Sequence, residues 1–144
     1  MKKMTALILI VLFLGLIVFT YAQKEEPKKM EADPAAELAK SIENGKKLFS
    51  DTSLGTSGMT CNSCHMEGGT KEGKMGDMTI PAWDNLAAKY PKYFGMAKKV
   101  MTLDQVNNWC IMNPLKGKPL AWDDQKLTDL TAYVASVKKV EKKK

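Results

Sequence analysis

The order of hydrophobic and polar positions divides the chain into an apolar N-terminal run and a series of helical patterns. The apolar run covers residues 5–23 and carries no charge. Three later segments repeat apolar residues at a helical period: 34–49, 103–112 and 124–137. No segment alternates in the manner of a half-buried strand. The pattern therefore predicts an all-α domain whose helices are joined by long loops, and such loops are usually functional.

Residues typical of helix starts precede the predicted helices. Asp33 is a predicted N-cap, followed by a proline at the first helical position. Thr102 begins a capping box for the second helix, and Asp123 is the predicted cap of the last. Residues 82–90 predict one more short helix, whereas the glycine-rich run 67–81 predicts little regular structure.

The N-terminal run has the organisation of an export signal. A short basic stretch precedes it, and residues 20–22 supply small side chains at a cleavage position. We therefore expect a signal peptide at 1–22, a flexible leader at 23–34, a folded domain at 35–138 and a basic tail at 139–144. This organisation places the domain in the periplasm or another extracytoplasmic compartment. An uncleaved membrane anchor is the alternative for the first segment.

Charge narrows the possible partners. The 144 residues include 22 lysines, no arginine and 16 acidic residues, for a net charge of +6. Five lysines lie in residues 138–144, so the body of the exported chain is close to neutral. No stripe of basic residues is interleaved with aromatic ones, and we therefore expect no nucleic acid partner.

Residues 61–65, Cys-Asn-Ser-Cys-His, form the C-x-x-C-H signature of c-type haem attachment. Two thiols three positions apart on a helical turn can add to the two vinyl groups of a porphyrin, and the following histidine becomes the proximal iron ligand. A thioredoxin-like dithiol would need a βαβ setting. A zinc site would need more ligands, and His65 is the only histidine. We therefore predict one covalent haem c, held by Cys61, Cys64 and His65.

The helices around this motif resemble those of the class I cytochrome c fold, in which an N-terminal and a C-terminal helix cross beside the haem. Gly45 and Tyr133 are the expected crossing residues. The resemblance also implies that the carbonyl of Ile80 or Pro81 fixes the second ring nitrogen of His65. We expect the tryptophans to wall the haem pocket or the core: Trp83, Trp109 and Trp122.

The residues alone leave the sixth iron ligand open. Methionine is the commonest partner of histidine in small cytochromes c, and several methionines could serve: Met75, Met78, Met96, Met101 and Met112. Cys110 lies at a suitable distance along the chain. Its alternative roles are a small apolar residue on a helix face shared with Leu103 and Val106, or half of an intermolecular disulfide.

The segments "SGMTCNSCHMEGGT", "LAAKYPKYF", "TLDQVNNWC" and "LKGKPLAWDDQKLTDLTAYV" narrow this choice. Together they resemble one haem domain of the Sox thiosulfate-oxidation cytochromes and thiosulfate dehydrogenases, over residues 48–137. The resemblance implies that Cys110, at the end of its helix, is the distal haem ligand, with Met112 as the alternative. The chain has one attachment motif where many of these proteins have two, and it lacks arginines that could bind an anionic substrate.

In size and layout the chain also resembles small His/Cys-ligated cytochromes that work as heterodimers in anaerobic nitrogen-metabolising bacteria. We therefore expect an electron carrier more than an enzyme: an exported monohaem cytochrome of low potential that serves redox partner proteins, with a heterodimer with a related cytochrome as one form. Two alternatives remain. One is binding of nitric oxide or carbon monoxide at the haem, and the other is an electron-accepting subunit of a thiosulfate-oxidising system.

Overall fold

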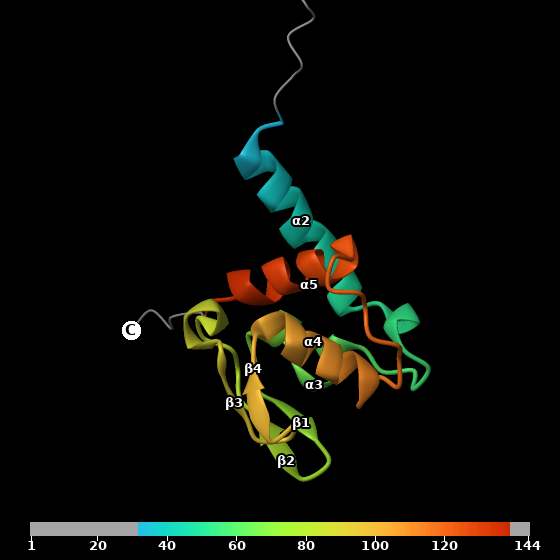
Figure 1. The fold of residues 1–144 in the computed structure, drawn as a ribbon. Coiled ribbons are helices and arrows are strands. Elements are labelled where there is room, and N and C mark those ends of the chain that lie inside the picture. The colour runs from blue at the N-terminus through green and yellow to red at the C-terminus, as the bar shows by residue number, and fades with distance from the viewer. Residues whose placement is uncertain (1–31, 139–144) are drawn as a thin grey trace, which may run out of the picture. The chain divides into compact units, whose positions relative to one another are not determined.

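The computed structural model describes residues 32–138 (Figure 1). The predicted signal peptide, nearly all of the leader and the basic tail lie outside these residues. The helices are α2 (Pro34–Phe49), α3 (Cys61–Cys64), α4 (Leu103–Met112) and α5 (Gln125–Ser136), with 3₁₀ turns η1 (Thr52–Leu54), η2 (Glu67–Gly69) and η3 (Leu86–Lys89). The strands are β1 (Gly73–Met75), β2 (Met78–Ile80), β3 (Lys92–Phe94) and β4 (Lys99–Met101). Within this described part, every helix is too short or too polar to span a membrane.

Two of the predicted helix starts are confirmed. The Asp33 carboxylate accepts a hydrogen bond from the backbone N–H of Ala35 at 3.0 Å, and α2 begins directly after it. The backbone N–H of Thr102 donates to Oε1 of Gln105 at 3.1 Å, which completes the predicted capping box of α4. Local hydrogen bonding therefore sets where both helices begin.

Two other predictions need correction. Asp124, and not Asp123, caps α5, because its carboxylate accepts from the backbone N–H of Lys126 at 2.9 Å. Two adjacent aspartates are equally good N-cap candidates in the sequence, and only the geometry of the preceding loop decides which of them caps the helix. Of the helix predicted over residues 82–90, only the turn η3 forms, and Asn85 before it has a left-handed backbone with φ of 49°.

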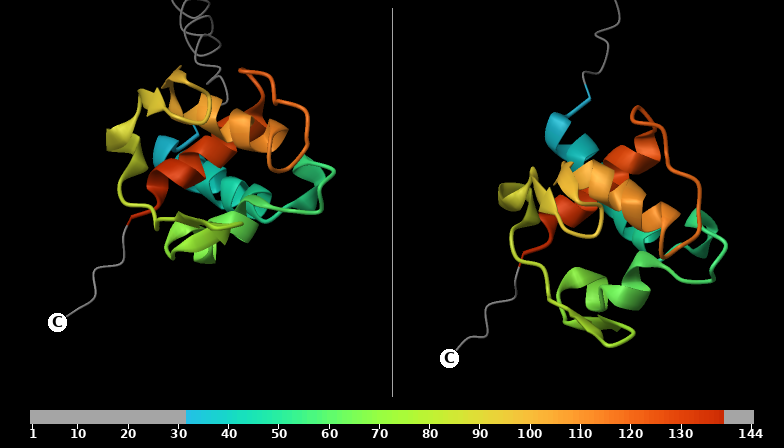
Figure 2. Two further views of the ribbon diagram at one scale, coloured as in Figure 1. Left: turned by 90° about the horizontal axis from the view of Figure 1, so that it is seen from below. Right: turned by 60° about the horizontal axis from the view of Figure 1, so that its bottom comes forward.

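The α2 and α5 helices cross at close range, as the two views of Figure 2 show. Gly45 of α2 lies against the backbone carbonyl of Asp129 and the Cβ atom of Tyr133. A Cβ atom on Gly45 would overlap both groups. The predicted role of Gly45 and Tyr133 as crossing residues is confirmed.

The core and a buried carboxylate hold this crossing together. Asp129 is only 5% exposed, and its carboxylate accepts hydrogen bonds from Ser41 at 2.6 Å and from Gln125 at 2.7 Å. Burial opposes ionisation of this carboxyl, but these hydrogen bonds outweigh it, and the net pKa of Asp129 lies below the ordinary value. Around the crossing pack the most deeply buried side chains: Phe49, Ile111 and Leu130.

Two hairpins correct the all-α prediction, so the domain is mostly helical with small sheets. β1 pairs with β2 in antiparallel register through Lys74 and Thr79, and β3 pairs with β4 through Tyr93 and Val100. The first hairpin lies within the glycine-rich run, where Gly76 supplies the positive φ of 60° needed at a tight turn. Three-residue strands are too short to show a period of two in the sequence.

Candidate cofactor site

A mainly apolar cavity of about 360 Å³ lies between α3, α4 and the hairpins. Its wall contains every residue predicted to hold the haem except the alternative ligand Met112: Cys61, Cys64, His65, Pro81 and Cys110. Apolar and aromatic side chains of the core complete the wall, among them Phe49, Leu130 and Val134. The cavity therefore brings residues that are far apart in sequence to one place.

The attachment motif forms a single helical turn. Cys61 and Cys64 stand three positions apart on α3, and such residues share one face of a helix. The backbone N–H of His65 donates to the carbonyl of Cys61 at 3.0 Å, so the imidazole follows directly from this turn. Both thiols and the imidazole line the same cavity.

The intervening residues of the motif position this turn. The hydroxyl of Ser63 accepts from the backbone N–H of Thr60 at 3.0 Å and closes the start of α3. The side-chain oxygen of Asn62 accepts from the backbone N–H of Gly68 at 2.8 Å and holds the loop that follows. The attachment signature leaves both positions unspecified, so only the fold shows these bonds.

His65 lies in an aromatic setting. Its ring centroid is 4.5 Å from that of Trp83 and 6.5 Å from that of Phe49. Burial lowers the pKa of His65 to about 4, which keeps the imidazole neutral, the form that binds a metal. Its Nδ1 atom is buried and has no hydrogen-bond partner among the described residues. The predicted bond to the carbonyl of Ile80 or Pro81 is therefore not made in this structure, although both residues line the cavity.

Helix α4 supplies a second wall. Leu103, Val106 and Cys110 all face the cavity, as their shared helix face predicts. Neighbouring asparagines fix the helix in place. Asn107 donates to the hydroxyl of Thr131 on α5 at 3.0 Å, and Asn108 exchanges two hydrogen bonds with the backbone of Leu120, at 2.8 and 2.9 Å. These bonds hold the position of Cys110 independently of any ligand.

The thiols share an electrostatic environment. Burial, with a smaller contribution from negative charge on Cys61 and Cys64, raises the pKa of Cys110 to about 12. All three cysteines line the same cavity. Burial likewise raises the pKa of Cys61 to about 11. A Cys110 thiolate in this cavity therefore requires a cation beside it, since no lysine or histidine there lowers its pKa.

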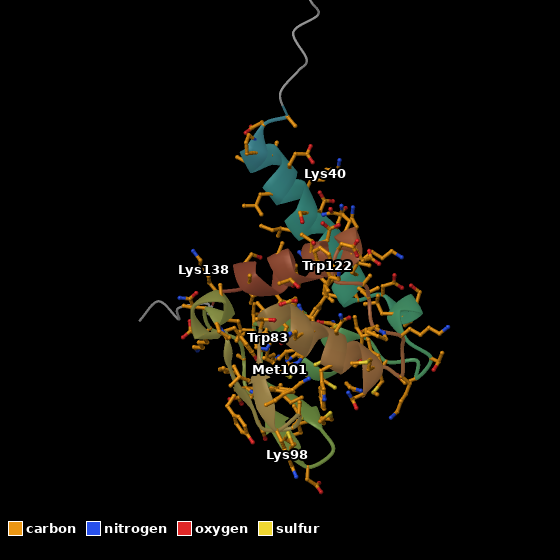
Figure 3. All side chains as sticks on the ribbon, viewed as in Figure 1. Lys40, Trp83, Lys98, Met101, Trp122 and Lys138 are labelled. Carbon is orange, nitrogen blue, oxygen red and sulfur yellow. The ribbon has the colours of Figure 1, made fainter. Side chains whose placement is uncertain are left out.

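The methionines and tryptophans divide between the cavity and the surface. Met112 is 41% exposed and lies outside the cavity wall, so its position does not favour it as the alternative ligand. Met75, Met78 and Met96 do line the cavity. Trp83 and Trp109 line it as predicted, but Trp122 is 86% exposed, so its predicted place in the pocket or the core is wrong (Figure 3).

Sequence reasoning missed a polar rim of the cavity. Lys89, Lys92 and Asp84 line it, and Nζ of Lys89 lies 3.9 Å from the Asp84 carboxylate. The Lys92 ammonium stands 4.8 Å above the ring of Tyr90, which also lines the cavity. In a chain with 22 lysines among 144 residues, these two lysines did not stand out in the sequence. Their gathering depends on the η3 turn and the β3–β4 hairpin.

The residues present fit a covalent haem. An apolar cavity suits a porphyrin, two thiols on one face suit its two vinyl groups, and a neutral buried imidazole suits iron. Among the described residues, no group of three or more His, Cys, Asp or Glu side chains is placed to hold a bare metal ion. With such a group bound, this arrangement can carry out one-electron redox chemistry.

The chain is similar in sequence and in fold to known proteins. The family model described as SoxA/TsdA, cytochrome c domain, matches residues 44–141, more than half of the chain. Thiosulfate dehydrogenase of Allochromatium vinosum is 27% identical over 108 residues, which cover 71% of this chain and 39% of that protein. The structure of thiosulfate dehydrogenase (TsdBA) from Marichromatium purpuratum shares the fold with a TM-score of 0.50 and 20% identity, over 77% of this chain and 25% of that one. The chain thus spans well under half of either relative.

Proposed function

The chain belongs to the SoxA/TsdA cytochrome c domain family and carries a covalently bound c-type haem, and on this premise we propose that it is an exported one-electron carrier of low potential. The haem supplies the iron redox couple when bound. The protein's contribution is to attach the group, ligate the iron and exclude water. One observation carries the proposal: the cavity wall brings Cys110 together with the attachment motif.

Each thiol has a separate role in this proposal. Cys61 and Cys64 form the thioethers, and His65 is the proximal ligand. Cys110 is the distal ligand, supported by its place on the α4 wall and by the hydrogen bonds of Asn107 and Asn108 that fix this helix.

The electrostatics of Cys110 support a low potential. Its thiol is strongly disfavoured as an anion without a neighbouring cation, because burial raises its pKa to about 12. Ferric iron offers more positive charge than ferrous iron, so a thiolate ligand stabilises the oxidised state. Axial ligand identity shifts haem potentials over roughly 0.8 V.

Electron paramagnetic resonance of the oxidised holoprotein tests the ligand. The wild-type protein is expected to show a low-spin thiolate signature that disappears in Cys110→Ala, with a rise in reduction potential. Met96→Leu is the matched control, since Met96 also lines the cavity but is not the proposed ligand. A thiolate signature that survives in Cys110→Ala, or one that Met96→Leu abolishes, would overturn the assignment.

Export is part of the proposal and is supported by the N-terminal sequence. The basic start, the apolar run at 5–23 and the small residues at 20–22 are typical of a signal peptide. Covalent haem attachment outside the plasma membrane agrees with this. Cell fractionation and the mass of the purified protein test it: cleavage after Ala22 gives a chain beginning at Gln23, whereas an anchored form keeps the N-terminal segment.

A second candidate is an electron-accepting subunit in thiosulfate oxidation, and the observation that favours it is the likeness to a thiosulfate dehydrogenase. The chain has one attachment motif and no arginine, so this role requires a partner that binds the substrate. Thiosulfate-dependent haem reduction by the purified chain, alone and with a cell extract, separates this role from simple electron transfer.

Binding of carbon monoxide or nitric oxide is a third candidate, supported by the place of Cys110 in the wall of the cavity. A bound haem would supply an iron that a gas could ligate, and Cys110 would hold that iron less firmly in the reduced state, because ferrous iron attracts a thiolate less than ferric iron does. Reduced protein that binds gas shows a shift of its Soret band on titration with carbon monoxide. An unchanged band excludes this candidate.

A further inference from the structure

We propose that the β3–β4 hairpin is the docking surface for an acidic redox protein. This inference rests on the proposed electron-transfer function and adds the surface and the chemistry of the partner. Three observations carry it: the distribution of charge over the domain, the exposed apolar pair on the hairpin, and the contribution of the same hairpin to the cavity wall.

Charge is distributed unevenly over the domain. Residues 32–138 contain thirteen lysines and twelve carboxylates. Residues 85–103, which include the hairpin, contain four of these lysines and no carboxylate, so the remainder has nine lysines against twelve carboxylates. The four lysines are exposed: Lys89, Lys92, Lys98 and Lys99. The hairpin is therefore a positive patch on a domain that is otherwise net negative.

Only one of these lysines lies near a carboxylate within the described residues. Lys89 is 3.9 Å from Asp84, and that pair is exposed to solvent. Asp84 can offset the charge of only one of the four lysines, so the patch keeps a net positive charge. Lys98 lies at the hairpin end of the molecule, and Lys40 on α2 lies at the opposite end of the view in Figure 3.

The hairpin has two different faces. Phe94 packs edge-to-face on Trp109 at 5.1 Å, and Met101 is buried at 4% exposure. Their neighbours Tyr93 and Val100 pair across the strands and are 63% and 65% exposed. Successive side chains of a strand point to opposite faces, so this apolar pair faces outward. This face is therefore a small exposed apolar patch on a lysine-bearing hairpin, and aromatic side chains are enriched in protein interfaces, whose rims are polar.

The same hairpin forms part of the wall of the cavity. Lys92, Phe94 and Met96 line the haem cavity. A partner seated on Tyr93 and Val100 is therefore separated from the cavity only by the thickness of the hairpin. That placement suits electron transfer, which weakens rapidly with distance.

The positive charge of the hairpin indicates which class of partner fits this surface best. Two copies of this chain would bring two sets of four lysines together, which disfavours a symmetric dimer through this face. An acidic lipid surface would attract the lysines, but the apolar pair is small for insertion into a membrane. An acidic protein would offset the charge of the lysines and bury Tyr93 and Val100, and complementary charge raises association rates.

Reduction of the ferric holoprotein by flavodoxin hydroquinone, an acidic low-potential protein, tests the proposal by stopped-flow spectroscopy. We expect the second-order rate to fall as ionic strength rises. At low ionic strength Lys98→Glu/Lys99→Glu lowers the rate about tenfold, within the range of electrostatic steering. The matched control is Lys40→Glu/Lys46→Glu on α2, which changes net charge equally and leaves the rate within about twofold.

A second variant tests the apolar pair. Tyr93→Ser/Val100→Ser lowers the rate with flavodoxin but leaves reduction by dithionite unchanged. Equal effects of the hairpin and α2 charge reversals would overturn the proposal, as would a wild-type dimer in sedimentation that Tyr93→Ser/Val100→Ser dissociates. Flotation with anionic vesicles that competes with flavodoxin would favour a lipid surface instead. A haem that accepts electrons from neither flavodoxin nor dithionite contradicts the electron-transfer function itself.

Discussion

At the crossing of α2 and α5, backbone and side chains meet without a gap. Gly45 lies directly against the Asp129 carbonyl, and the buried Asp129 carboxylate accepts hydrogen bonds from Ser41 and Gln125. In the neighbouring cavity, by contrast, Nδ1 of His65 has no protein partner among the described residues, and Cys61 and Cys110 are only half-buried. The crossing is thus packed by protein atoms alone, whereas the cavity needs the haem to fill it before its walls can pack as a hydrophobic core. Stability and redox function should therefore respond to different substitutions.

The largest effect should come from preventing haem attachment. In Cys61→Ala/Cys64→Ala the cavity of about 360 Å³ loses its covalent contents, and the walls lose their packing partners. We expect helix content to persist in part, near-ultraviolet circular dichroism to collapse and the unfolding transition to become broad. A haem-free variant that unfolds cooperatively at the wild-type denaturant concentration would show that the fold around the cavity does not need haem for its stability.

The second-largest effect is expected for Gly45→Ala, which changes the crossing and leaves the cavity intact. The new Cβ atom overlaps the carbonyl of Asp129, and such overpacking costs about 1–3 kcal/mol. Urea unfolding of the holoprotein measures the loss, while the haem spectrum and potential should stay unchanged. Gly95→Ala is the control, since a Cβ atom there meets open space. A change in potential with Gly45→Ala would mean that the two regions are coupled.

Tyr133→Phe tests the bond that joins the two regions. The Tyr133 hydroxyl donates to the carbonyl of Gly68, in the loop after the attachment motif, at 3.1 Å. Its loss should cost about 1 kcal/mol in urea unfolding. Tyr93→Phe, at an exposed position, should cost nothing measurable. Equal losses in the two variants would contradict a specific role for the bond.

The smallest effect should be the pH dependence contributed by Asp129. Its folded pKa lies below the ordinary value of 3.8, because hydrogen bonds from Ser41 and Gln125 favour the carboxylate. The resulting stabilisation is present above pH 3.8 and is lost as pH falls through the lower folded pKa. Asp129→Asn should therefore lose less stability than wild type between pH 5 and pH 2, measured by urea midpoints. An identical loss in both proteins would exclude Asp129 as a contributor.

Sequence reasoning succeeded where chemistry and structure are local. The attachment motif needs only five consecutive residues. The Asp33 carboxylate accepts from the backbone N–H of Ala35, and the backbone N–H of Thr102 donates to the side chain of Gln105, so both caps act within three residues. The glycine at the crossing was detectable because glycine within a helix is costly unless a close contact requires it. The hairpins were missed because strands of three residues leave no period in the sequence.

By itself, the sequence determined the haem attachment motif, the starts of α2 and α4 and the crossing of α2 with α5, since each depends on short-range hydrogen bonds or on one sterically demanding glycine. Only the tertiary structure placed Cys110 in the wall of the cavity and Met112 outside it. It also selected Asp124 over Asp123 and left Tyr93 and Val100 exposed on a hairpin that carries lysines. These outcomes depend on how distant segments pack, because neighbouring residues with the same chemistry face different surroundings once the helices and hairpins are in place.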